Sequence, residues 1–234
     1  MSADAVVLGA GSSARMGGAD KLLADLEGAA VIVWSLRAFD GCPGIRSVAV
    51  TTSEHNDAKL REIVAKAGLA KVRAFVRGGS SRAESVLHGL RALSGDPPDY
   101  VAVHDGARPL VTSAMIEDGL RMARVYGAAV AAVPATDTLK IVDRERLVIR
   151  TPLRSSVWHA QTPQFARFAD LLGAHERQTA MLDLYTDDVS VLEAEGLPVR
   201  VFEGSRENLK ITTPDDLDAA ARIVRQRRVG AGST

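Results

Sequence analysis

Short apolar runs alternate along this chain with longer amphipathic stretches. The runs with the length and apolar content of β-strands are residues 5–8, 47–52, 72–76, 100–104, 128–133 and 199–203. The stretches between them that are predicted to be helical are residues 31–39, 57–67, 83–93, 113–127 and 214–227. Within residues 57–67, for example, apolar side chains recur at helical spacing and charged side chains occupy the other face.

Strands that alternate with helices predict an α/β fold. We expect a Rossmann-like, mostly parallel sheet with helices on both faces. The first strand is apolar on both of its faces, which is typical of a central strand in such a sheet. Ligands of these folds bind at the carboxyl ends of the strands, so the residues that follow each strand are the first candidates for a site.

Residues 140–159 break this alternation. Their apolar residues fall in two β-like clusters, 141–142 and 147–149, separated by four charged residues. We expect a β-arm that projects from a single domain formed by residues 1–228, and a partner subunit that covers the arm's apolar side chains. Residues 229–234 are small and mostly polar, so we expect a frayed tail.

Composition and charge narrow the function. The 29 basic residues balance the 29 acidic ones, so nothing in the net charge favours nucleic acid or an anionic membrane as a partner. No segment approaches the ~20 apolar residues of a membrane-spanning helix, and no signal-like start is present, so we expect a cytoplasmic protein. Cys42 is the single cysteine, which excludes an internal disulfide and a cysteine-rich zinc site.

A glycine-rich segment directly follows the first strand. Gly9 and Gly11 would let the backbone approach a phosphate closely, and with Ala14 they also match the dinucleotide fingerprint G-x-G-x-x-A. That fingerprint needs an acid at the end of the second strand, ~20 residues on, and the second strand here comes later and ends in threonine and serine. Arg15 and Lys21 add two cations, which a triphosphate requires and a dinucleotide does not.

Asp105 follows the buried strand 100–104 and precedes a glycine and an arginine. A carboxylate at a strand end is well placed to bind Mg²⁺, which uses one or two carboxylates together with phosphate oxygens and water. The plain structural alternative is a turn or cap aspartate. His104 is interpreted as a packed histidine, because no second histidine lies at ligand spacing.

With these segments identified, the chain resembles the 2-C-methyl-D-erythritol 4-phosphate cytidylyltransferase family. The resemblance covers nearly the whole chain and keeps the order of seven motifs. These motifs are residues 9–21, 78–86, 103–109, 135–140, 158–164, 186–188 and 208–212. The tripeptide Gln161-Thr162-Pro163 and the stretch 105–109 are the most diagnostic.

The resemblance implies a set of roles for particular residues. The cations that would hold the triphosphate of CTP and stabilise the reacting α-phosphate are Arg15, Lys21 and Lys210. The nucleotide-binding residues would be Ala10, Gly11, Gly79, Ser80 and Ser85, and the metal ligand for Mg²⁺ would be Asp105. The residues that would face the methylerythritol phosphate are Arg108, Thr138, Arg154, Thr162 and Thr186, with Arg154 and Thr162 reaching it across a homodimer. The reaction would transfer CMP from CTP to that substrate and release pyrophosphate, and the substrate's phosphate needs no general base.

The sequence departs from the family pattern at the glycine-rich segment and leaves alternatives open. Asp20 precedes Lys21 where the family usually has proline, and Ser13 replaces a glycine. A carboxylate beside the lysine either weakens its hold on the triphosphate or helps to bind metal. The alternatives are a ribitol-5-phosphate cytidylyltransferase, a guanylyl- or uridylyltransferase, a non-catalytic nucleotide-binding homologue and, least supported, a dinucleotide oxidoreductase. Glu207 is a further candidate for a second carboxylate at the metal.

Overall fold

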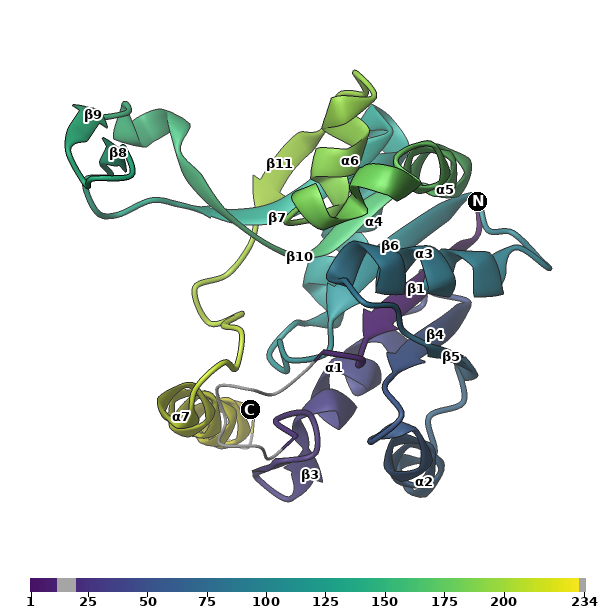
Figure 1. Ribbon diagram of the computed structural model, residues 1–234. Coiled ribbons are helices and arrows are strands. Elements are labelled where there is room, and N and C mark those ends of the chain that lie inside the picture. The colour runs from purple at the N-terminus through teal and green to yellow at the C-terminus, as the bar shows by residue number, and fades with distance from the viewer. Residues whose placement is uncertain (12–19, 232–234) are drawn as a thin grey trace.

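A seven-stranded sheet forms the centre of the molecule in the computed structural model, which describes residues 1–11 and 20–231 (Figure 1). The strands lie in the order β11-β7-β10-β6-β1-β4-β5, and neighbours pair in parallel except around β10, which runs antiparallel to β6 and β7. Their bounds are β1 (Ala3–Leu8), β4 (Ser47–Thr52), β5 (Val72–Arg77), β6 (Tyr100–Asp105), β7 (Ala128–Pro134), β10 (Trp158–Arg167) and β11 (Arg200–Glu203). Two short pairs lie outside this sheet: β2 (Asp25–Leu26) with β3 (Ala29–Ala30), and β8 (Ile141–Val142) with β9 (Val148–Arg150). The predicted Rossmann-like sheet is confirmed.

Helices cover both faces of this sheet. They are α1 (Val31–Asp40), α2 (Asp57–Ala67), α3 (Arg82–Leu93), α4 (Ser113–Tyr126), α5 (Phe168–Arg177), α6 (Asp188–Ala194) and α7 (Pro214–Ala231), with short 3₁₀ turns η2 (Arg154–Ser156) and η3 (Thr179–Leu184). One apolar cluster joins α1, α2 and α4 to the sheet, and another joins α3, α5 and α6 to the opposite face. Strand β1 contributes Val7 to the first and Val6 to the second, both fully buried, as its continuous apolar run requires.

Strand β10 was not predicted from the sequence. It carries Gln161, Thr162 and Pro163, a combination without the apolar alternation of a strand, and proline is excluded from regular central strands. The structure accommodates these residues at an irregularity in the pairing with β7, between Ala160 and Gln164. The ring of Phe165, further along β10, packs so closely on α4 that a side chain at Gly119 would overlap it.

The elements of the projecting arm fall within the predicted range 140–159. The arm comprises β8, β9 and η2, whereas Trp158 and His159 already belong to β10 (Figure 1). Helices α5 and α6 were also absent from the predicted elements. At the other end of the chain, α7 continues to Ala231, so residues 229–231, which were expected to fray, are helical, and residues 232–234 lie outside the described range.

Helix α7 packs on the β2–β3 hairpin rather than on the main sheet. A third apolar cluster joins them, and it includes Leu26 of β2 and Val224 of α7. Arg225 and Arg228 of α7 also reach the carboxylate of Glu27 in the hairpin turn. This contact brings the segment after Lys21 close to the segment after Lys210, although they lie at opposite ends of the chain.

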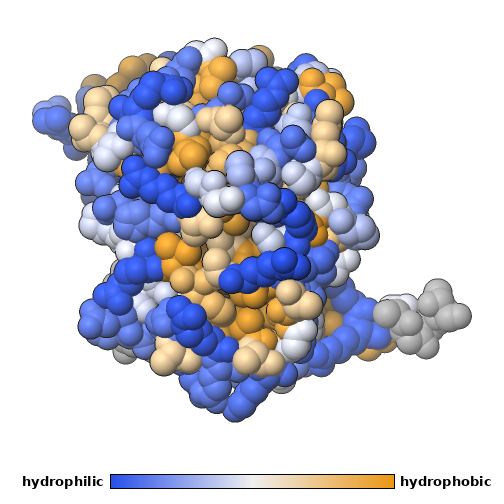
Figure 2. Space-filling model, turned by 90° about the vertical axis from the view of Figure 1, so that its right-hand side faces the viewer, coloured by the Kyte–Doolittle hydropathy of each residue, from blue (hydrophilic) through white to orange (hydrophobic). Residues whose placement is uncertain are grey.

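Figure 2 shows the face that lies on the right-hand side of Figure 1. Hydrophilic residues form most of this surface, and apolar residues gather in a band across its middle. Among the residues that the structure describes, no helix combines the length and the apolar character needed to cross a bilayer.

Candidate active site

A cavity of about 390 Å³ opens at the carboxyl edge of the sheet. Three adjacent parallel strands end there, since Leu8 of β1 lies in register with both Thr51 of β4 and Asp105 of β6. The residues that line the cavity are Leu8, Ala10, Gly11, Lys21, Leu22, Thr51, Gly79, Ser80, Ser81, Arg82, Ser85, Asp105, Gly106, Ala107 and Lys210. The place is the one at which open α/β sheets bind their ligands.

The start of the glycine-rich segment is held against β4. The backbone N–H of Gly9 donates to the hydroxyl of Thr51 (3.1 Å), and a Cβ at Gly9 would collide with the carbonyl oxygen of that threonine. Only glycine therefore fits this position. Ala10 and Gly11, which follow Gly9, line the cavity, and so does Lys21 at the end of the motif. Arg15, the other cation predicted here, lies outside the described residues.

The turn before α3 forms a second wall of the cavity. The hydroxyl of Ser85 donates to the carbonyl of Ser81 (2.9 Å) and accepts from the N–H of Gly79 (3.0 Å). The Ser80 hydroxyl donates to the carboxylate of Glu84 (2.7 Å), and the Ser80 bonds hold the pKa of Glu84 below its usual value. Gly79, Ser80 and Ser85, three of the predicted nucleotide-binding residues, are thus brought together in one hydrogen-bonded turn.

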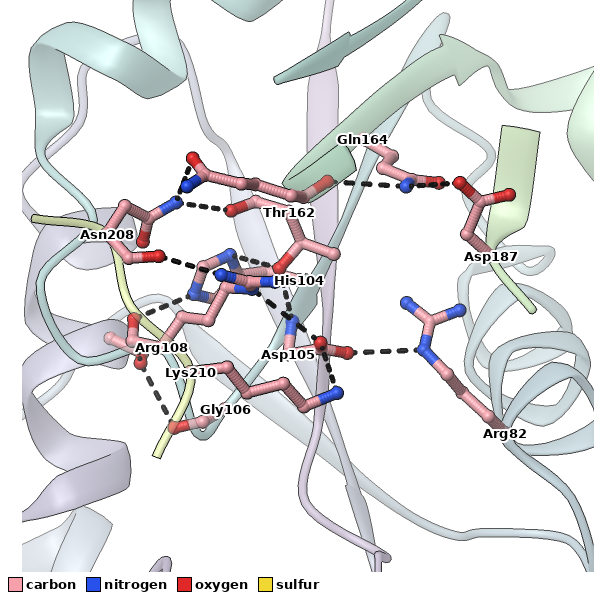
Figure 3. A network of polar contacts seen from close by, with 12 residues as sticks. Arg82, His104, Asp105, Gly106, Arg108, Thr162, Gln164, Asp187, Asn208 and Lys210 are labelled. Carbon is pink, nitrogen blue, oxygen red and sulfur yellow. Dashed lines mark hydrogen bonds and ion pairs between the residues drawn. The ribbon is translucent and has the colours of Figure 1, made fainter. Parts of the chain in front are cut away.

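Asp105 lies at the centre of a cluster of cations (Figure 3). Lys210 Nζ lies 2.7 Å from one carboxylate oxygen, and Arg82 Nε lies 3.2 Å from the other. Arg108 Nε approaches to 3.8 Å. Burial alone would raise the pKa of Asp105, but Arg82, Lys210 and Arg108 hold it well below its usual range. The carboxylate is therefore ionised at neutral pH and faces the cavity.

Arg82 is a site residue that sequence reasoning did not single out. Its guanidinium lies between two carboxylates: Nε bonds Asp105, and the two terminal nitrogens bond Asp188 at 2.7 and 2.9 Å. Asp188 opens α6, and its backbone N–H donates to the side chain of Gln164 on β10 (2.9 Å). The signal available in the sequence was the position of Arg82 within the motif 78–86, but its partner Asp188 is 106 residues away.

The side chains of Thr162 and His104 hold the backbone around Asp105 in place through hydrogen bonds. The Thr162 hydroxyl accepts from the backbone N–H of Asp105 (3.0 Å) and donates to His104 Nδ1 (3.2 Å). His104 Nε2 in turn donates to the carbonyl of Arg108 (3.1 Å). Burial lowers the pKa of His104 to about 4, so the ring is neutral at pH 7, as a packed histidine should be. Thr162 is 4% exposed and bonded within its own chain, and its expected contact with a partner's substrate stays a prediction.

The side chain of Asn208 anchors the chain segment that leads to Lys210. It is fully buried, and its amide donates to the carbonyl of Thr162 (2.9 Å) and to the side chain of Gln161 (3.3 Å). The backbone carbonyl of Asn208 accepts from Arg108 Nη1 (2.7 Å). Arg108 is not among the residues that line the cavity, and burial lowers its pKa.

Three of the predicted substrate residues lie away from this cavity. Thr138 and Thr186 are exposed in loops, and Arg154 is exposed on η2 in the arm, where its guanidinium donates to the carbonyl of Thr136 (3.1 Å). Figure 1 shows the arm projecting away from the body of the same chain. None of these three side chains is among the described residues that line the cavity.

The acidic groups limit where a metal could bind. Among the described residues, no group of three or more histidine, cysteine, aspartate or glutamate side chains could hold an ion. Among the described residues that line the cavity, Asp105 alone is acidic. Glu207, the candidate second carboxylate, instead pairs with Arg227 of α7 (2.8 Å).

A family model and the curated relatives of this chain indicate the same protein family. The model of the family described as 2-C-methyl-D-erythritol 4-phosphate cytidylyltransferase (IspD) matches residues 3–226. The protein of that name from Dehalococcoides mccartyi is 42% identical over 224 residues, 96% of each chain. The one from Pelotomaculum thermopropionicum is 40% identical over 227 residues, 96% of this chain and 94% of that relative.

Solved structures agree with this match. The 4-diphosphocytidyl-2C-methyl-D-erythritol synthase from Anaerococcus prevotii has a TM-score of 0.85 at 27% identity, covering 96% of both chains. The 2-C-methyl-D-erythritol 4-phosphate cytidylyltransferase from Thermus thermophilus has a TM-score of 0.75 at 28% identity, covering 96% of this chain and 100% of the other.

Proposed function

Since this chain belongs to the 2-C-methyl-D-erythritol 4-phosphate cytidylyltransferase family, we propose that its cavity at the sheet edge is where it transfers CMP from CTP to that polyol phosphate. The observation that supports this best is the convergence of four separate chain segments on one cavity. The glycine-rich segment, the turn before α3, the end of β6 and the segment of Lys210 all line it. Between them, these segments were expected to bind the triphosphate, the base and the metal ion of the same reaction.

The chemistry at this site is displacement at the α-phosphorus of CTP. An oxygen of the polyol's phosphate forms the new P–O bond, and the bond to the β-phosphate breaks, so pyrophosphate leaves with the electron pair. Lys21 and Lys210 would neutralise the charge that develops on the phosphates, with Arg15 as a further predicted cation. The attacking phosphate is already ionised near pH 7, so positioning and charge neutralisation account for catalysis without a general base.

The turn before α3 would recognise the base. Gly79, Ser80 and Ser85 all line the cavity, and the Ser85 hydroxyl holds the turn closed through its bond to the N–H of Gly79. Ala10 packs directly against this turn, because a side chain at Gly78 would overlap its Cβ. A short, hydrogen-bonded turn suits a pyrimidine better than a purine.

Asp105 fits a role as the protein ligand of Mg²⁺. It is ionised and lines the cavity, and magnesium commonly combines one carboxylate with phosphate oxygens and water. When bound, the ion would supply positive charge to the triphosphate. Arg82 and Lys210 would hold the carboxylate in place.

The arm is proposed to make the protein a homodimer and to complete the polyol site. Its apolar side chains are strongly exposed in the single chain, among them Leu147 (70%), Ile149 (63%) and Leu153 (74%). Exposed apolar groups gathered on one projection are typical of an association surface. Arg154 lies on the same arm, so a second copy would bring it to the partner's substrate. A cytoplasmic location stays a prediction from the sequence.

The direct test is pyrophosphate release from each of the four NTPs, with and without Mg²⁺, crossed with methylerythritol 4-phosphate and ribitol 5-phosphate. We expect release only with CTP, methylerythritol phosphate and Mg²⁺. Lys210→Met should lower kcat by about 10²-fold or more, whereas Lys66→Met, a matched change on the exposed face of α2, should not. Turnover with ribitol phosphate would indicate the sister activity, and no turnover in folded protein would favour a non-catalytic homologue.

The shared site is tested by mixing two inactive variants. In a heterodimer of Arg154→Ala with Lys210→Met, one site receives an intact body from one chain and an intact arm from the other. Random exchange of equal amounts should therefore restore roughly a quarter of the wild-type rate. If Arg154 serves its own chain, the mixture stays inactive.

A further inference from the structure

The side chain of Asn56 connects three loops beside the cavity. Asn56 precedes α2 and is 1% exposed. Its amide nitrogen donates to the carbonyl of Gly9 (2.9 Å) and to the carboxylate of Asp20 (2.8 Å), and its oxygen accepts from the N–H of Ser53 (2.8 Å). An amide offers two donor hydrogens and one acceptor oxygen, so these three bonds satisfy the buried group.

Asp20 directly precedes Lys21, and two further hydrogen bonds of Asp20 hold the chain at this point. Its other carboxylate oxygen accepts from the N–H of Leu22 (3.0 Å), which is the pattern of an Asx-turn, and its carbonyl accepts from the N–H of Leu23 (3.0 Å). Leu22 is 2% exposed and belongs to the main core cluster. Lys21 therefore lies between an aspartate tethered on both oxygens and a buried leucine, and its side chain lines the cavity.

We propose that Asp20 and Asn56 form a positioning pair that aims Lys21 at the phosphates of the nucleotide. The same amide holds Gly9, where the glycine-rich segment begins, and Asp20, where the chain arrives at the lysine. Asp20 acts through Lys21, because it is not among the residues that line the cavity. The inference rests on the proposed contact of Lys21 with the triphosphate.

The two effects that Asp20 can have differ in sign. As a negative charge near a triphosphate it would weaken CTP binding, so its removal would lower KM for CTP and leave kcat unchanged or higher. As an anchor it would hold the lysine in the reactive geometry, so its removal would lower kcat. The hydrogen bonds to Leu22 and Asn56 favour the second effect, since both carboxylate oxygens face the protein.

Steady-state kinetics of Asp20→Ala distinguish these effects. We expect kcat to fall by about tenfold or more, because small displacements of a group at the reacting centre are costly. KM for the polyol phosphate should stay within about twofold, since the substrate's own contacts are intact. The kcat of Asp20→Asn should lie between those of wild type and Asp20→Ala. Asparagine can still accept from the N–H of Leu22, but its NH₂ group would then face the NH₂ group of Asn56. Asp25→Ala is the matched control: it removes a carboxylate that binds the N–H of Gly28 in the next turn, and it should retain the wild-type kcat.

The deciding measurement repeats Asp20→Ala in a Lys21→Ala background. If Asp20 acts through the lysine, its loss should change the residual rate by less than about twofold there. An equal loss in both backgrounds would overturn the proposal, because it would indicate a general structural effect, and so would an unchanged or raised kcat in the single variant. Full activity of Lys21→Ala alone would instead show that the proposed role of the lysine is wrong, and the positioning pair would fall with it. Thermal unfolding of each variant confirms that the compared proteins are folded.

Discussion

Replacing Asp188 with asparagine removes one charge from a cluster whose members depend on one another. The side chain of Asp188 is 1% exposed, and both of its oxygens bond the guanidinium of Arg82, which is itself 26% exposed. Three cations share two carboxylates in this cluster, so its formal charge is +1 and becomes +2 in the variant. Asp105 would then be the single carboxylate that balances Arg82, Arg108 and Lys210.

The expected cost follows from the contacts that remain. Removal of one partner from a fully buried ion pair destabilises a protein by about 3–5 kcal/mol. Arg82 keeps its bond to Asp105 and reaches solvent, and asparagine still offers one acceptor oxygen, so we expect about 2–3 kcal/mol here. Asparagine has nearly the size of aspartate, so packing of α6 contributes little to this figure.

Urea unfolding followed by circular dichroism and tryptophan fluorescence measures this change. With an m value of about 3 kcal/mol/M, the midpoint should fall by about 0.7–1 M. The same substitution at Asp118, whose pairing with Arg121 (3.1 Å) is on the surface, should cost no more than about 0.5 kcal/mol. If Asp188→Asn is no more destabilising than Asp118→Asn, the cluster does not depend on this carboxylate and the reasoning is refuted.

Two further changes test the packing and the pH dependence. Gly119→Ala should destabilise the protein by about 2 kcal/mol or more because its methyl group would overlap the ring of Phe165, whereas Gly95→Ala meets open space; equal unfolding midpoints in urea would contradict this. Burial lowers the pKa of His175, so below about pH 6.5 the unfolded chain binds a proton that the folded chain does not, and stability falls as the pH drops. His175→Leu should therefore lose less stability than wild type between pH 7.5 and 5.5 in urea titrations, with His104 still contributing, and an identical loss in both proteins would count against this account.

Much of the site could be predicted because its residues lie at strand ends. Asp105 and the glycine-rich segment each follow an apolar run, and parallel strands bring such positions to one edge. The residues that hold them there were not predictable in the same way. Arg82 and Asn56 act through partners far away in the sequence, and only the folded chain shows that those partners are adjacent.

The part of the fold that escaped prediction is also explained by particular residues. Strand β10 holds polar side chains and a proline because Gln161 and Thr162 bond to Asn208 and to the backbone of Asp105, and not because they pack as a strand would. Function at this position overrides the periodicity on which the prediction depends. The arm, in contrast, was recognised from its two apolar clusters, which form β8 and β9.

The arm and the active site share one strand, which constrains how the chain can change in length. Residues inserted at the exposed turn between β8 and β9, near Leu147, would lengthen the arm without shifting any position of β10. A single residue inserted between Trp158 and Thr162 would instead turn every side chain on one side of the insertion to the opposite face of the sheet. Thr162 would then leave Asp105 and His104. The location of an insertion, more than its length, decides whether such a variant keeps its site.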